Sequence, residues 1–269
     1  MIRIGLSIII LFWSLSTVNA DHGGPGKMVY IPYMDGKKEP NSTVVLTAED
    51  SRAVVIFLGG GKGQFNWSSN HKSTDFPATN ATMHLYKKNI SVLVPDWPYS
   101  MKIFHGGYKM ECGKRCSDES YERLLNVMEY AQKKYPGQPI WIVGHSNGSI
   151  TIDRFTKYLA KLSRLEELAG AVSSASRKEM KVEAPNFRLA FMHHYNDNCQ
   201  YNPRSVAETL YKKHKKTLGD NVSLHWIKGG GNGGKWDKKG QCIGGTHSYE
   251  FAEEEVTQTL RTIILGDKQ

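Results

Sequence analysis

The stretch PIWIVGHSNGSIT, residues 139–151, decides the fold that we predict for this chain of 269 residues. A short apolar run, Ile140 to Val143, leads directly into Gly144 to Gly148, which has the pattern G-x-S-x-G. A serine on a tight strand-to-helix turn needs strained backbone angles, and the flanking glycines remove the Cβ atoms that would collide there. We therefore expect Ser146 to be a nucleophile. The alternative is an ordinary glycine-rich loop.

The residues on either side of the motif favour this setting. Ile140 to Val143 suits a short strand that is buried on both faces of a sheet. Beyond the turn, apolar residues recur at helical spacing, at Phe155, Tyr158, Leu159 and Leu162. The motif therefore joins a predicted strand to a predicted helix.

The rest of the chain repeats this alternation. Apolar runs typical of strands occur at Met28 to Tyr33, Thr43 to Thr47, Ala53 to Leu58, Ile90 to Val94, Gly170 to Ser174, Phe187 to His193 and Val222 to Ile227. Helical patterns cover Tyr121 to Tyr135, a lysine-rich segment before Val222, and Tyr249 to Leu265. Such alternation predicts an α/β fold with a mainly parallel central sheet and helices on both faces. Ligands of these sheets bind beyond the carboxyl ends of the strands.

A serine hydroxyl needs a base to take its proton and an acid to orient that base. His247 follows the last predicted strand and opens the final helix, so we assign it as the general base. Asp197 follows the run that ends in His193 and His194, and its carboxylate can accept the Nδ1–H of His247. Asp96 is the rival acid because it also ends a strand, although a turn-forming role is the simpler interpretation.

Acyl transfer also needs hydrogen-bond donors for the developing oxyanion. The run Gly59 to Gly61 follows a predicted strand, and glycines let backbone N–H groups approach a charged oxygen without obstruction. We expect Gly60, or Gly61, to donate together with the N–H of Asn147. A plain tight turn is the alternative.

With these residues the chain resembles enzymes of the α/β-hydrolase fold over residues 28–265. The match rests on the order Ser146, Asp197, His247, on the elbow Gly144 to Gly148, and on Leu58 to Gly61 in the place of the lipase and esterase H-G-G-G element. Leu58 replaces the histidine of that element, but backbone N–H groups form the oxyanion hole. The resemblance implies a mechanism and leaves the substrate open.

Many members of this family carry a lid after the sixth family strand. Here only about a dozen residues separate Ser174 from Phe187, too few for a large cap, so we predict none. We also expect no cofactor and no metal. The segment GGGNGGK at 229–235 matches the start of a phosphate-binding loop. Trp236 stands where serine or threonine should hold magnesium, so we do not predict nucleotide binding.

Four cysteines suggest two disulfides in an exported chain. Of the three possible pairings we choose Cys112 with Cys116 and Cys199 with Cys242. The second bond would tie the segment of Asp197 to that of His247. Free or metal-bound thiols are the alternative, and the chain has no C-x-x-C pair for zinc.

Residues 1–20 resemble a secretory signal, with Arg3, the apolar run Ile4 to Leu15, and small residues before a cleavage site. That run is too short for a membrane anchor. We predict one mature domain, residues 21–269, secreted or periplasmic and without a transmembrane anchor after cleavage.

The formal net charge of +9 favours an anionic surface or a polyanion as a possible partner, without specific nucleic-acid binding. Much of the excess positive charge lies in the lysines of residues 212–216. A solvated helix face is the simpler explanation for these lysines.

Together these patterns predict a secreted serine hydrolase that cleaves carboxylic esters through an acyl-enzyme, acting on a small-molecule or acylated substrate. A peptidase or thioesterase of the same fold is one alternative. A non-catalytic protein that binds polyanions on a hydrolase scaffold is the other.

Overall fold

The computed structural model describes residues 26–33, 36, 38–61, 63, 65, 77–96, 116–182, 184, 186–231, 233–236 and 242–266. The signal peptide predicted at residues 1–20 and Cys112 lie outside these residues.

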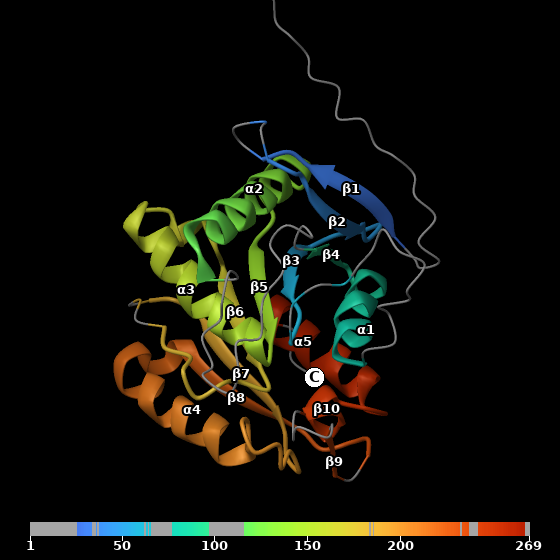
Figure 1. Ribbon diagram of the computed structural model, residues 1–269, viewed down its shortest axis with the longest axis vertical. Coiled ribbons are helices and arrows are strands. Elements are labelled where there is room, and N and C mark those ends of the chain that lie inside the picture. Colours follow the sequence, from blue (N-terminus) through green and yellow to red (C-terminus); the bar gives the residue numbers. More distant parts are fainter. Residues whose placement is uncertain are drawn as a thin grey trace, which may run out of the picture.

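A mostly parallel sheet forms the centre of the molecule (Figure 1). Within the described residues it has eight strands in the order β1-β2-β4-β3-β5-β6-β7-β8. Their bounds are β1 Lys27–Ile31, β2 Asn41–Leu46, β3 Ala53–Leu58, β4 Ile90–Pro95, β5 Ile140–His145, β6 Gly170–Ser174, β7 Leu189–His194 and β8 Val222–Ile227. Strand β2 pairs antiparallel with β1 and β4, and every other pair is parallel. The predicted fold class is confirmed.

Helices cover both faces of this sheet, as predicted (Figure 1). The helices are α1 Pro77–Met83, α2 Asp118–Lys134, α3 Asn147–Lys161, α4 Arg204–Leu218 and α5 Glu253–Leu265. Alternate residues of β3 point to opposite faces. Val54 and Ile56 join a core with α2, α3 and α4, whereas Val55 and Phe57 join a core with α1 and α5. Strand β3 is therefore buried on both faces, which explains its unbroken apolar sequence.

The chain between β6 and β7 contains no large cap. Its described residues, 175–182, 184 and 186–188, form no helix or strand. The lysines at positions 212, 213 and 216 are exposed on α4, in agreement with a solvated helix face. None of the described helices is long and apolar enough to cross a membrane.

The structure differs from the sequence-based expectation near the last strands. The final helix begins at Glu253 instead of Tyr249, and His247 lies in a 3-10 turn, Thr246–Ser248. A small hairpin precedes that turn, formed by β9 Gly234–Trp236 and β10 Cys242–Gly245. These strands are too short and too rich in glycine to show an alternating apolar pattern.

Gly148 allows α3 to pack directly against the end of β3. A Cβ atom on Gly148 would overlap the carbonyl oxygen of Leu58. Because backbone atoms cannot move aside, Gly148→Ala should lower the free energy of unfolding by about 2 kcal/mol or more, measured by urea denaturation. Gly266→Ala is the control: its φ of +70° and ψ of 12° are left-handed helical, with open space around it, so only strain of about 1 kcal/mol is expected. Equal losses would contradict the packing argument.

Candidate active site

Ser146 lies on the turn that joins β5 to α3. Its φ is 52°, a left-handed value that is costly for a residue with a side chain. Gly144 and Gly148 make this turn possible, because a Cβ on Gly144 would lie 2.5 Å from the carbonyl oxygen of Gly148. The serine therefore stands at the carboxyl end of β5, as the motif predicts.

Two side chains from distant segments meet Ser146. The Nε2 atom of His247 lies 3.2 Å from Ser146 Oγ, and its Nδ1 atom lies 3.0 Å from Asp197 Oδ2. The aspartate and the histidine are both buried. This is the geometry in which a serine can pass its proton to an imidazole while a carboxylate fixes the tautomer.

The carboxylate of Asp197 is held from several sides. Its Oδ1 accepts the backbone N–H of Cys199 at 2.9 Å. Its Oδ2 also lies 3.2 Å from Nε2 of His193, and the same nitrogen lies 2.9 Å from the carbonyl oxygen of Asn202. Burial alone would raise the pKa of Asp197, but the contacts with His193 and His247 outweigh it and lower the pKa. The group therefore stays ionised opposite His247 at neutral pH.

A chain of buried hydroxyl groups supports the turn that carries His247. Tyr249 donates to the carbonyl of Met192 at 3.0 Å, and its hydroxyl oxygen lies 2.9 Å from Ser174 Oγ. Ser174 in turn lies 3.1 Å from Nδ1 of His145, the residue before the nucleophile. Burial, and next the nearby His247, keep the pKa of His145 well below its usual range. His145 is therefore a neutral group behind the site.

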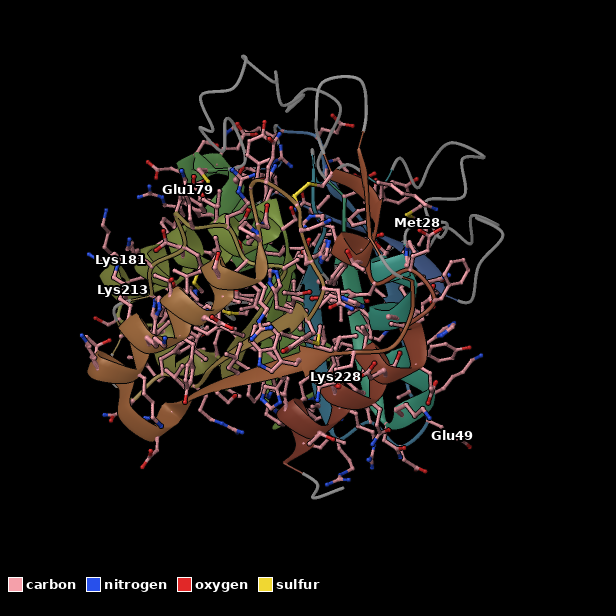
Figure 2. The ribbon with its side chains drawn as sticks, turned by 90° about the horizontal axis from the view of Figure 1, so that it is seen from below. Met28, Glu49, Glu179, Lys181, Lys213 and Lys228 are labelled. Atoms are coloured by element: carbon pink, nitrogen blue, oxygen red, sulfur yellow. A yellow bond between two sulfur atoms is a disulfide. The ribbon has the colours of Figure 1, made fainter. Side chains whose placement is uncertain are left out.

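A disulfide joins the acid and base segments. Cys199 follows Asp197, Cys242 begins β10, and the bond between them is the pairing chosen from the sequence (Figure 2). Cys116 is also disulfide-bonded. The Cys112–Cys116 pairing remains a prediction because Cys112 lies outside the described residues.

The two expected oxyanion donors lie beside the nucleophile. Gly60 packs so closely that a Cβ on it would be 3.2 Å from Ser146 Cβ. Asn147 is the first residue of α3, where backbone N–H groups have no partner within the helix and the helix dipole is positive. Both segments therefore border Ser146.

Asp96 holds a different loop. Its Oδ1 accepts the backbone N–H of Phe65 at 2.8 Å, and its own N–H donates to Ser42. The carboxylate that reaches His247 is that of Asp197. The turn-forming interpretation of Asp96 fits this placement.

Adjacent histidines do not form a metal site here. His193 contacts the acid, whereas Nε2 of His194 lies 2.8 Å from the carbonyl of Gly229. Among the described residues, no group of three His, Cys, Asp or Glu side chains could hold a metal ion.

Arg177 is the residue of this region that sequence reasoning missed. It follows β6, and its Nη1 donates to Oδ1 of Asn147 at 3.3 Å. A lone arginine on a loop carries no spacing signal, so only the packing of β6 beside β5 reveals it.

Comparison with solved structures agrees with this fold. A dienelactone hydrolase from Anabaena variabilis matches with a TM-score of 0.59 at 12% identity, covering 91% of this chain and 100% of that one. A serine α/β hydrolase from Xanthomonas campestris, described as lacking a lid, matches with a TM-score of 0.58 at 14% identity over 90% of this chain and 94% of the other. Est1E from Butyrivibrio proteoclasticus, solved with ferulic acid bound, matches with a TM-score of 0.56 at 14% identity over 88% of this chain and 98% of the other.

No family model and no curated protein matches the sequence. The structural likenesses show the fold: the chain has the α/β-hydrolase fold of these three proteins.

The disulfide joins the loop of Asp197 to the hairpin strand that precedes His247. Replacing Cys199 and Cys242 together by serine should lower the free energy of unfolding by about 2–4 kcal/mol, because the bond constrains the unfolded chain. It should also slow the reaction of Ser146 with a fluorophosphonate, since the loops of Asp197 and His247 lose their covalent link. Cys116→Ser is the comparison, with a smaller effect on Ser146 reactivity. Wild-type reactivity in the double variant would contradict the link.

Proposed function

We propose that this protein is a serine hydrolase that cleaves carboxylic esters through an acyl-enzyme intermediate. The single observation that carries the proposal is the alignment of His247 between Ser146 Oγ at 3.2 Å and Asp197 Oδ2 at 3.0 Å. A single buried hydrogen bond would serve a purely structural purpose equally well. The chain of contacts observed here instead ends at a serine whose backbone is strained.

In the first half of the proposed reaction, Ser146 Oγ attacks the ester carbonyl carbon while His247 Nε2 takes the hydroxyl proton. Asp197 stabilises the resulting imidazolium and stays ionised. The carbonyl oxygen becomes an oxyanion between the N–H groups of Gly60 and Asn147. The tetrahedral intermediate then expels the alcohol, which receives its proton from His247.

In the second half, water replaces the alcohol. His247 takes a proton from the water as the water attacks the acyl carbon. When the second tetrahedral intermediate collapses, His247 gives this proton to Ser146 Oγ. The carboxylic acid leaves and the starting state is restored. Each half uses the same base and the same donors, so one site serves both.

Esters are preferred to peptides and thioesters as the proposed substrates. Est1E has the same fold and was solved with ferulic acid bound, and the absence of a helix or strand in the described chain between β6 and β7 suits small or acylated substrates. The aligned side chains argue against a purely polyanion-binding protein.

We further propose that residues 1–20 are removed as a signal peptide and that residues 21–269 act outside the cytoplasm. The disulfide between Cys199 and Cys242 supports this location, because such bonds persist in oxidising compartments.

Labelling with a fluorophosphonate probe tests the nucleophile. The wild type should be labelled on Ser146, and both Ser146→Ala and His247→Ala should lose labelling, since one lacks the attacking oxygen and the other lacks the base. Mass spectrometry of the labelled peptide provides the measurement. Undiminished labelling of both variants would refute the assignment.

The choice of acid is tested by two asparagine variants. Asp197→Asn should slow acylation by about 10⁴-fold, as in serine proteases, because the amide favours the wrong tautomer of His247. Asp96→Asn is the matched control and should change the rate far less. Hydrolysis of a panel of aryl esters, thioesters and peptides at pH 7 gives the rates, and the reverse order of effects would make Asp96 the acid.

A further inference from the structure

The side-chain amide of Asn147 joins two loops that border Ser146. Its Nδ2 donates to the carbonyl oxygen of Gly61 at 3.1 Å, and its Oδ1 accepts from Arg177 Nη1 at 3.3 Å. Gly61 belongs to the loop after β3, and Arg177 to the loop after β6. Because β5 lies between these two strands, one side chain connects the carboxyl ends of three adjacent strands.

The partners of this amide determine its orientation. A guanidinium only donates hydrogen bonds, and a carbonyl oxygen only accepts them. With the amide turned over, its NH₂ group would face Arg177 and its oxygen would face the carbonyl of Gly61. Only the observed orientation satisfies both neighbours, so Arg177 fixes the direction in which Asn147 donates.

Arg177 is itself firmly placed. Its side chain is 8% exposed, and its Nε lies 3.5 Å from Glu179, which is labelled in Figure 2. The guanidinium lies over the ring of Tyr201, 5.5 Å from the centroid. Its backbone N–H donates to Ser149 Oγ at 3.0 Å, and Ser149 donates to the carbonyl of Ser146 at 2.6 Å. The arginine is thus tied to the first turn of α3 through both its backbone and its side chain.

The loop that Asn147 reaches is the one that packs against the nucleophile. Gly60 touches Ser146, as described above, and Gly63 N–H closes the turn on the carbonyl of Gly60 at 2.9 Å. Gly61 has a φ of +54°, which favours glycine at this position. A shift of this turn would move the N–H of Gly60 away from the oxyanion, and hydrogen bonds weaken steeply when misaligned.

We propose that Asn147 and Arg177 form a positioning pair for the oxyanion hole. Arg177 holds the amide of Asn147, and that amide holds the turn of Gly60 and Gly61 where its N–H converges with the backbone N–H of Asn147. This inference rests on the proposed function, because an oxyanion arises only when Ser146 attacks a substrate. The side chain of Asn147 thereby acts through its neighbours, while its backbone N–H contacts the reacting oxygen.

The rate constant for fluorophosphonate labelling of Ser146 tests the pair without knowledge of the substrate, because the probe also develops a negative oxygen in the hole. Asn147→Ala keeps the backbone N–H and should lower this constant by about tenfold to a hundredfold, less than the loss of a whole oxyanion donor. The pH dependence of labelling should stay unchanged, since Asp197 and His247 are not altered. With an aryl ester, kcat should fall and KM should stay within about twofold, the pattern of a lost transition-state interaction.

Arg177→Gln should lower the labelling constant by about threefold to tenfold, and the double variant should be no worse than Asn147→Ala, because two residues that act in series are not additive. Asn221→Ala is the control: Asn221 is exposed before β8, so wild-type kinetics are expected. Circular dichroism establishes that each variant is folded, and Asn147→Ala alone suffices if Arg177→Gln does not fold.

Wild-type labelling of Asn147→Ala would overturn the inference while leaving the proposed function intact, and so would additive losses in the double variant. A shifted pH dependence would also overturn it, by assigning the effect to His247. An absence of labelling in the wild type would refute the proposed function, and the inference with it.

Discussion

The direct contact between α3 and the end of β3 is the constraint on which the site depends. The helix begins on top of the strand without a side chain between them, because Gly148 lies against the carbonyl of Leu58. This contact brings the loop after β3 beside the turn of Ser146 and forces that serine into a left-handed conformation. The strain is held by the burial of β5 between its parallel neighbours, β3 and β6. A stable core therefore holds one half-buried serine in an unfavourable backbone geometry.

Electrostatics around the histidine follow from the same packing. Asp197 is a buried negative charge, and burial of an unpaired charge is costly. Donors from Cys199, His193 and His247 compensate that charge. The rings of His145 and His247 lie 5.3 Å apart, so the low pKa of His145 matters. A charged His145 would repel the imidazolium that His247 must become, whereas a neutral one does not.

Much of this arrangement was predictable from the sequence, because the responsible signals are local. The bounds predicted for β3, β6 and β8 match the observed ones, and β3 is an unbroken apolar segment because it is buried on both faces. The meeting of Ser146 and Asp197 followed from one rule, that residues after parallel strands share one edge of the sheet, whereas His247 reaches them from the turn after β10. Hairpin β9–β10 and the link from Arg177 to Asn147 had no such signal, because they depend on contacts between loops and not on periodicity.

The order of Ser146, Asp197 and His247 in the chain has a consequence for biosynthesis. The serine and the aspartate are translated well before the histidine, which lies beyond β10 and close to α5, the last helix. A chain that ends before His247 can contain β3, β5, β6 and β7 but lacks the imidazole that lies 3.2 Å from Ser146 Oγ. The contact between these two side chains therefore requires nearly the whole domain, up to the turn before α5.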